Sequence, residues 1–253
     1  MVSQTITIDV AGSPMPAYLA RPDDDGQQRQ AVIVLQEIFG VNTEVKRIAD
    51  LVAAAGYVGL AINYYHRTHP DLNEPYTPEG FQAGFKAAGA VSKASLRQDV
   101  AASIDWLNAC GYVERNQIAT WGFCFGGTVA FVTSTLPGLV AAICFYGTSI
   151  AAPLAGGEPE AIADAADVRC PLLLVYGGQD TSITTDHIER TRAALTAAHK
   201  QFEIQVYPEQ NHAFFRDSGA QLDAHGGTAN AGAPDDVADA WDRVQTFLRR
   251  SFA

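Results

Sequence analysis

The chain has 253 residues, so it suits one large domain or two small ones and is long enough to bury a substantial core. Hydrophobic residues make up 47% of it and charged residues 18%, which is ordinary for a globular enzyme. The net charge of −11 argues against a nucleic-acid-binding protein, which needs a basic face, and it requires local arginines or lysines wherever an anionic substrate binds.

Eight short apolar runs are predicted to be β-strands. In chain order they span Thr5–Asp9, Ala17–Arg21, Ala31–Gln36, Val58–Tyr64, Gln117–Gly122, Val140–Tyr146, Leu172–Tyr176 and Glu203–Tyr207. Several, such as "AVIVLQ" and "PLLLVYGG", are apolar throughout, as expected for strands that are covered on both faces. The first two strands are joined without room for a helix, which predicts an antiparallel edge at this end of the sheet.

Amphipathic stretches between the strands are predicted to be helices. They cover residues 43–56, 94–111 and 184–199, and a last helix begins near Pro234. The first follows Asn42, a good N-cap, and stops at Gly56, a residue that commonly ends a helix. Because strands and helices alternate, the sequence predicts a single α/β domain over residues 1–253, with a mostly parallel sheet and helices on both faces.

Three connections look irregular, and each is polar or rich in proline and glycine. They are His66–Gly80, Thr148–Asp167 and Arg216–Ala233. Long connections of this kind on a compact scaffold are typical of lids and binding loops, so we expect at least one to lie over a binding site.

The ends and the cysteines indicate the compartment. The start, "MVSQTITIDV", lacks the basic and apolar regions of a signal peptide, and no stretch approaches the roughly 18 apolar residues of a membrane span. The four cysteines form no Cys-x-x-Cys pair and no zinc-like cluster with histidine. We therefore expect a cytoplasmic protein with reduced thiols, no membrane contact and no metal.

One cysteine lies in a glycine-rich turn. Residues 122–126 read "GFCFG", between the strand "QIATWG" and a stretch, "GTVAFVTSTL", that can form a helix. A nucleophile on a tight strand–helix turn needs glycines on either side, since a side chain at Gly122 or Gly126 would collide with the neighbouring strand or helix. The helix N-terminus favours a thiolate. The pattern alone leaves two alternatives for Cys124, a catalytic nucleophile or a small buried apolar residue.

Two further residues favour catalysis. Asp180, in "VYGGQD", and His212, in "YPEQNHAFF", each follow a predicted strand. Taken singly, Asp180 is more often explained as a helix cap, and His212 as a packing or surface residue. Together with Cys124 they stand in the order nucleophile, acid, base, which is the order of an α/β-hydrolase triad. We predict a Cys124–His212–Asp180 triad.

With "LQEIFG" at residues 35–40, these motifs make the chain similar to the dienelactone hydrolase family, the carboxymethylenebutenolidases, over nearly its whole length. The resemblance implies the α/β-hydrolase fold, no metal and no organic cofactor. It also implies hydrolysis of an enol-lactone, typically 4-carboxymethylenebut-2-en-4-olide to maleylacetate in the degradation of chlorinated aromatics. The expected partner is a small, anionic lactone or ester, and the expected state is a monomer or small homo-oligomer.

The resemblance also implies roles for individual residues. Cys124 would be the nucleophile, His212 the general base and acid, and Asp180 the residue that orients the imidazole. The backbone N–H groups of Ile38 and Phe125 would form the oxyanion hole, in agreement with the expectation that one donor follows the nucleophile and the other lies after an early strand.

Glu37 matches a family glutamate that lies beside the thiol. Without the resemblance it is equally well an ion-paired or capping carboxylate. An unpaired carboxylate near sulfur disfavours the thiolate. Our hypothesis is that Glu37 restrains Cys124 when the site is empty and accepts its proton when substrate binds.

The expected substrate carboxylate calls for cations in the pocket. Arg216, in "HAFFR", matches one family arginine, although it is also explained as a solvated surface residue. The family's second arginine comes from the helix after the fourth strand, where this chain reads "EGFQAGFKAAGA" and has none. Lys86 is a possible replacement, without the guanidinium fork, and Arg67 is another. Tyr64 and Phe85 are expected to line the pocket.

Two other functions remain open at this point. One is a generic esterase or thioesterase with the same triad and a neutral substrate, which the missing arginine favours and Arg216 opposes. The other is a non-catalytic binding or redox-sensing protein in which Cys124 is oxidised. The presence of His212 and Asp180 argues against it, because a sensor does not need a triad.

Overall fold

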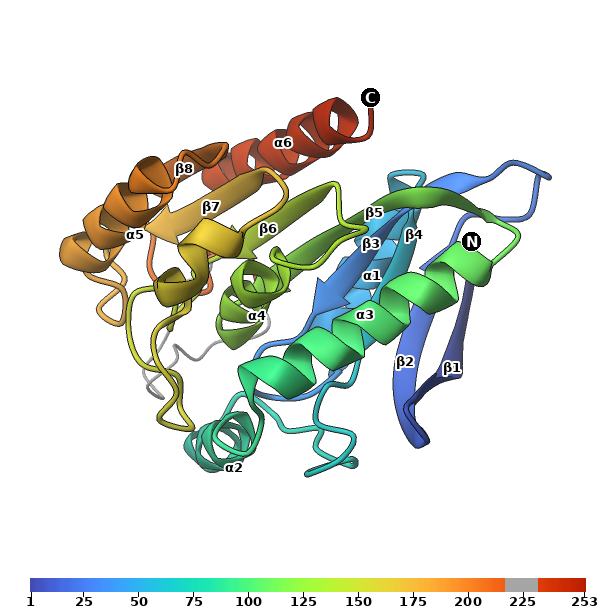
Figure 1. Ribbon diagram of the computed structural model, residues 1–253, viewed down its shortest axis with the longest axis horizontal. Helices are drawn as coiled ribbons and strands as arrows, with labels where there is room; N and C mark the ends of the chain where they lie inside the picture. The colour runs from blue at the N-terminus through green and yellow to red at the C-terminus, as the bar shows by residue number, and fades with distance from the viewer. Residues whose placement is uncertain (217–231) are drawn as a thin grey trace.

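The computed structural model describes residues 1–216 and 232–253. Within these residues eight strands form one sheet in the order β1-β2-β4-β3-β5-β6-β7-β8 (Figure 1). They are β1 (Val2–Val10), β2 (Ser13–Arg21), β3 (Arg29–Leu35), β4 (Val58–Ile62), β5 (Val113–Phe123), β6 (Ala141–Phe145), β7 (Leu172–Gly177) and β8 (Phe202–Tyr207). All eight predicted strands are present, and β5 starts at Val113 instead of Gln117.

The sheet is parallel except at its first edge. The pairings from β4 through β3, β5, β6 and β7 to β8 are all parallel. β1 and β2 are antiparallel, as are β2 and β4, so the predicted antiparallel edge is confirmed. Ala11 and Gly12 join β1 to β2 with positive φ angles of 52° and 85°, as a tight two-residue hairpin requires.

Helices cover both faces of the sheet. They are α1 (Thr43–Ala54), α2 (Pro78–Ala88), α3 (Lys93–Ala109), α4 (Phe125–Thr133), α5 (Thr185–Ala197) and α6 (Pro234–Ser251), with a short 3₁₀ helix η1 (Ala161–Asp167). In Figure 1, α3 and α4 lie in front of the sheet and α1 behind it. The α/β class predicted from the sequence is therefore confirmed. None of the helices in the described residues is both long and apolar enough to cross a membrane.

Local signals explain where the helices begin and end. The Asn42 side chain accepts a hydrogen bond from the Val45 amide at 3.1 Å, which caps α1 as predicted. Gly56 follows α1 with φ of 97°, a conformation that favours glycine.

The prediction of irregular structure up to Gly80 is wrong at its end, because α2 begins at Pro78. Thr77 caps this helix through the Gly80 amide, and proline fits the first helical position, where no N–H bond is needed. In the second irregular segment, η1 occupies Ala161–Asp167. Of the third, residues 217–231 lie outside the described part of the chain.

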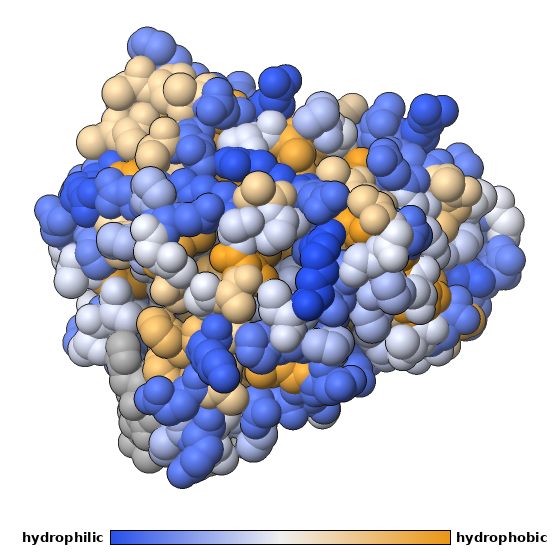
Figure 2. Space-filling view, turned by 60° about the horizontal axis from the view of Figure 1, so that its bottom comes forward, coloured by the Kyte–Doolittle hydropathy of each residue, from blue (hydrophilic) through white to orange (hydrophobic). Residues whose placement is uncertain are grey.

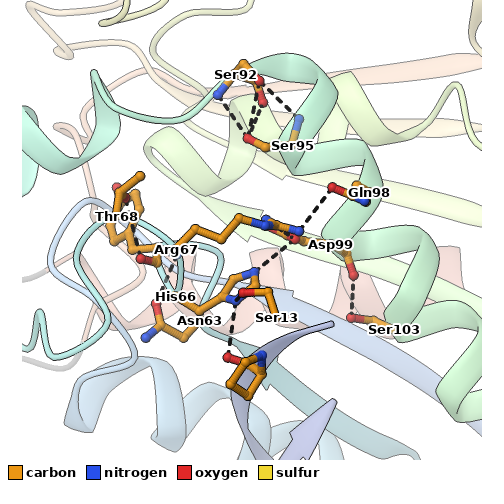
Figure 3. A network of polar contacts seen from close by, with 12 residues as sticks. Ser13, Asn63, His66, Arg67, Thr68, Ser92, Ser95, Gln98, Asp99 and Ser103 are labelled. Atoms are coloured by element: carbon orange, nitrogen blue, oxygen red, sulfur yellow. Dashed lines mark hydrogen bonds and ion pairs between the residues drawn. The ribbon is translucent and has the colours of Figure 1, made fainter. Parts of the chain in front are cut away.

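A buried polar network fixes the segment that follows β4 (Figure 3). His66 Nε2 lies 3.1 Å from Asp99 Oδ1 on α3, and Arg67 donates to the same oxygen at 2.6 Å. On its other side, His66 Nδ1 lies 3.2 Å from the Ser13 hydroxyl on β2. The network thereby ties this segment, including the neighbouring Tyr64, to two separate elements.

The turn between β5 and α4 is packed backbone against backbone. A Cβ added at Gly122 would lie 1.9 Å from the Gly126 carbonyl oxygen, and one added at Gly126 would lie 2.2 Å from the Leu35 carbonyl oxygen at the end of β3. The predicted need for glycine at both positions is confirmed. This contact sets the height of the turn above the sheet.

We expect Gly126→Ala to lower the free energy of unfolding by about 3 kcal/mol or more, because the new methyl group meets backbone that cannot move away. Urea unfolding monitored by circular dichroism measures the change. Gly111→Ala is the matched control, since a Cβ there meets nothing within 4 Å and should change stability by no more than about 0.5 kcal/mol. Equal effects of the two substitutions would contradict the steric explanation.

Candidate active site

Cys124 occupies the turn between β5 and α4 in a strained conformation. Its φ and ψ are 54° and −120°, in the left-handed region that non-glycine residues rarely adopt. Its amide donates to the Phe145 carbonyl at 3.0 Å, and its carbonyl accepts the first helical bond of α4 from Gly127 at 2.9 Å. The thiol is therefore held at the helix N-terminus, as a nucleophile elbow requires.

His212 and Asp180 come together at the ends of β8 and β7. His212 Nδ1 lies 2.6 Å from Asp180 Oδ2, and because a carboxylate only accepts, Nδ1 is the donor. The other oxygen of Asp180 accepts from the Ser182 amide at 2.8 Å, from its hydroxyl at 2.5 Å and from the Ile183 amide at 3.2 Å. The helix α5 is capped by Thr184. Asp180 thus orients the imidazole and is not the cap of α5.

Charge at the site keeps this pair ionised. Burial acts to raise the pKa of Asp180, but hydrogen bonds from His212 and Ser182 outweigh it and bring the pKa below its ordinary value. Burial acts to lower the pKa of His212, but the negative charge of Cys124 and the bond to Asp180 outweigh it and raise the pKa to about 10. The raised pKa of His212 therefore favours its imidazolium form.

The second ring nitrogen of His212 faces the reacting centre. His212 Nε2 is buried and makes no hydrogen bond to nitrogen or oxygen among the described residues, while the Cys124 side chain interacts with the imidazole. The Tyr146 ring meets the imidazole edge to face at 5.0 Å and limits how it can turn. With Nδ1 held by Asp180, Nε2 is the atom left to exchange a proton with sulfur or water.

The two predicted oxyanion donors lie on either side of the close contact at Gly126. In the described part of the chain, neither the Ile38 amide nor the Phe125 amide donates a hydrogen bond to another group. Phe125 is the first residue of α4, where N–H groups have no partner within the helix. Both amides are thus available to an oxyanion.

Tyr64 supports the loop that carries Ile38. It is buried, and its hydroxyl donates to the Gln36 carbonyl at 2.5 Å, while its ring lies 6.1 Å from that of Phe125. It also lines an adjacent surface pocket of about 360 Å³. Tyr64 therefore supports the backbone of the loop after β3 that carries Ile38, and its place in the substrate pocket stays a prediction.

Glu37 and Arg216 are paired with each other. Arg216 Nε lies 3.1 Å from both Glu37 oxygens, and Nη2 donates to Oε1 at 2.7 Å, with both side chains at most 4% exposed. The Tyr76 hydroxyl donates to Glu37 Oε2 at 2.8 Å. Glu37 is thus not the unpaired carboxylate that our hypothesis assumed, and Arg216 is not a solvated surface residue.

Of the other expected pocket residues, Lys86 and Phe85 lie on α2, and Arg67 contacts α3. Lys86 is exposed on α2, as is Phe85, which is 51% exposed and stacks on Phe81 at 6.2 Å. Figure 2 turns the α2 end of the molecule forward and shows hydrophobic residues there in small patches among hydrophilic ones. Arg67 donates to Asp99 and Gln98. The structure therefore joins neither Lys86 nor Arg67 to the Glu37–Arg216 pair.

The other three cysteines are Cys110, Cys144 and Cys170. All four are free; Cys144 and Cys170 are buried, and burial raises their pKa. Across residues 1–216 and 232–253, no group of three or more His, Cys, Asp or Glu side chains could hold a metal ion.

Comparisons with known proteins show the family of the chain. The model of the "Dienelactone hydrolase family" matches residues 15–252. The chain belongs to this family. A Synechocystis protein named "Putative carboxymethylenebutenolidase" is 34% identical over 244 residues, 96% of this chain and 95% of that protein. An Escherichia coli protein of the same name is 35% identical over 218 residues, 86% of this chain and 79% of that one.

The fold of a solved family structure is similar as well. The crystal structure of "Putative Dienelactone Hydrolase" from Klebsiella pneumoniae superimposes with a TM-score of 0.84 at 29% identity and covers 98% of both chains. The α/β-hydrolase fold and the resemblance inferred from the motifs are confirmed. This family member is a hydrolase that acts on an ester or a lactone.

Sequence reasoning missed Tyr76 and Ser182. Ser182 follows Asp180 by two residues, a spacing at which an aspartate commonly binds the backbone of its own turn, so it could have been inferred. Tyr76 belongs to the connection that was predicted to be a binding loop, but nothing in its neighbours indicates that it meets Glu37.

We expect Cys124→Ala to lower the pKa of His212 from about 10 toward its ordinary value, because the negative charge of Cys124 is the largest influence that raises it. A pH titration of the imidazole carbon-bound protons by NMR measures the shift. Cys110→Ala, at a half-buried cysteine elsewhere, serves as the control. An unchanged His212 pKa in Cys124→Ala would show that the thiol and imidazole are not coupled.

Proposed function

We propose that the protein hydrolyses an activated enol-lactone or ester, such as 4-carboxymethylenebut-2-en-4-olide to maleylacetate, through a Cys–His–Asp triad and a thioester intermediate. The observation that carries the proposal is the arrangement of the triad. Cys124 stands on a strained elbow, and His212 is fixed by Asp180 with its Nε2 atom buried and without a nitrogen or oxygen partner in the described residues. Family membership supports the reaction type.

In the first step the Cys124 thiolate attacks the acyl carbonyl. The developing oxyanion accepts hydrogen bonds from the Ile38 and Phe125 amides, which need no rearrangement to meet it. The C–O bond of the ring then breaks, and the enolate leaves with a proton from His212.

In the second step water hydrolyses the thioester. Acylation removes the negative charge of Cys124, which is the largest influence that raises the pKa of His212. The neutral imidazole that results can take a proton from water. The charge that stabilises the imidazolium in the free enzyme thus disappears at the step where His212 has to act as a base.

A thiol nucleophile restricts the substrate. Thiolate leaves readily from a tetrahedral intermediate, so a poorly stabilised alkoxide competes badly with it, whereas an enolate competes well. We therefore propose activated esters and lactones over ordinary lipids or peptides.

The role of Glu37 depends on Arg216. The Glu37 oxygens are occupied by the Arg216 guanidinium and the Tyr76 hydroxyl, so Glu37 accepts the thiol proton only if a substrate carboxylate first draws Arg216 away.

A second candidate is a carboxylesterase or thioesterase that uses the same triad on a neutral substrate. The pairing of Arg216 with Glu37 favours it, because this arrangement presents little net positive charge to an incoming anion. The absence of arginine in "EGFQAGFKAAGA" points the same way.

We expect Cys124→Ala to reduce kcat/KM for activated esters by roughly 10³-fold or more, since the covalent step is lost. Intact-protein mass spectrometry of the quenched wild-type reaction should show the mass of one acyl group on Cys124. Cys110→Ala should retain wild-type activity. Full activity of Cys124→Ala would refute the triad, and a wild type inactive on all activated esters would favour the binding or sensing alternative.

We expect the carboxylated enol-lactone to have a kcat/KM at least about tenfold above that of its methyl ester, because a charge-assisted contact with Arg216 is lost in the ester. Steady-state kinetics with the two compounds at one ionic strength measures the ratio. A ratio below one would favour the neutral-substrate esterase.

A further inference from the structure

Tyr76 makes two separate contacts with the Glu37–Arg216 pair. Its hydroxyl donates to Glu37 Oε2 at 2.8 Å, and its ring lies under the guanidinium, with Arg216 Cζ 4.2 Å from the ring centroid. Burial, and next the charge of Glu37, raise the pKa of Tyr76 well above its ordinary value, so the hydroxyl keeps its proton and remains a donor. One side chain therefore holds both members of the pair.

Tyr76 is held in turn by the loop that carries Glu37. Its ring meets Phe39 edge to face at 4.6 Å, and the Glu74 amide donates to the Phe39 carbonyl at 2.9 Å. Nearby, a Cβ at Gly40 would lie 2.0 Å from the Leu72 carbonyl oxygen, so the backbones of the two segments touch. The position of Tyr76 is thus set relative to Glu37 and does not depend on α2 alone.

The cavity that Glu37 and Arg216 line leaves this pair little room to move. The cavity beside Glu37 and Arg216 has a volume of about 10 Å³ and is lined mainly by Val45, Phe123, Tyr146 and Phe215. A space of that size holds about one water molecule at most. Movement of Arg216 away from Glu37 is therefore resisted by packing on one side and by Tyr76 on the other.

We propose that Tyr76 is a positioning residue that holds Arg216 on Glu37 and so sets how readily the site accepts a carboxylate-bearing acyl group. The proposal rests on the proposed function in placing the acyl group beside Cys124. A substrate carboxylate has to compete with Glu37 for the guanidinium. The Tyr76 hydroxyl favours the Glu37–Arg216 pair over a pair of Arg216 with the substrate. It does so because it is the neutral donor to the buried Glu37 Oε2 atom.

The test uses two alkylating reagents of similar size, iodoacetate and iodoacetamide, which differ by a negative charge. The rate of modification of Cys124 by each is followed by mass spectrometry of its peptide, and neither rate requires hydrolytic activity. Tyr76→Phe keeps the ring against Arg216 and removes only the hydroxyl. Tyr18→Phe is the matched control, because Tyr18 also donates to a carboxylate, that of Asp50, at 2.9 Å.

We expect the ratio of the iodoacetate rate to the iodoacetamide rate to rise roughly three- to tenfold in Tyr76→Phe and to stay at the wild-type value in Tyr18→Phe. Tyr76→Leu, which removes the ring as well, should raise the ratio at least as far. In hydrolysis, Tyr76→Phe should lower KM for a carboxylated substrate with little change in kcat, a split that a general loss of stability would not produce.

The proposal is overturned if the ratio is unchanged in both Tyr76 variants, or if Tyr18→Phe raises it equally. Failure of the proposed function is a different result, namely a wild type that hydrolyses no activated ester or lactone. The alkylation ratio can be measured in either case, so the two failures are distinguishable.

Discussion

The site depends on one close approach of backbone to backbone, where α4 begins against the end of β3. Because Gly122 and Gly126 have no side chains, the turn between them comes within contact distance of the neighbouring carbonyls. That approach forces Cys124 into a left-handed conformation and places its amide neighbour, Phe125, next to the loop of Ile38. The same packing contact thus positions Cys124 and the amides of Ile38 and Phe125, which we propose as nucleophile and oxyanion donors.

Two buried carboxylates, Asp180 and Glu37, each pair with a different positively charged side chain of the site. Asp180 accepts hydrogen bonds from His212 and from the Ser182 amide of the following turn, and its negative charge stabilises the imidazolium form of His212. Glu37 accepts hydrogen bonds from Arg216 and Tyr76, and its negative charge balances the charge of the Arg216 guanidinium. Each buried charge has an opposite charge and further donors, which is the condition under which ionised groups persist away from water. In the function that we propose, the first pair serves proton transfer and the second governs which acyl charge the pocket tolerates.

The sequence was sufficient for the elements whose signal is local. All eight strands were predicted, and the central ones, such as β6 and β7, were read from continuous apolar runs because both of their faces are covered; Asn42 marked its helix through its own hydrogen bond. The order Cys124, Asp180, His212 was informative because parallel strands end at the same edge of the sheet. The pairing of Glu37 with Arg216 was not predictable. The two lie 179 positions apart, and whether a buried cation binds the protein or the substrate depends on distances that no pattern encodes. Tyr76 was missed for the same reason.

Five residues of the site follow five different strands: Glu37 follows β3, Tyr76 follows β4, Cys124 follows β5, Asp180 follows β7 and His212 follows β8. Glu37 directly precedes the proposed oxyanion donor Ile38, and Arg216 follows His212 by four positions, whereas Tyr76 lies on the connection after β4, apart from the proposed triad. If Tyr76 acts as we propose, substitutions in the connection after β4 change which substrates are accepted while Cys124, Asp180 and His212 stay in place. In that case substrate preference can evolve by single substitutions in this connection, and each variant along the way keeps its triad.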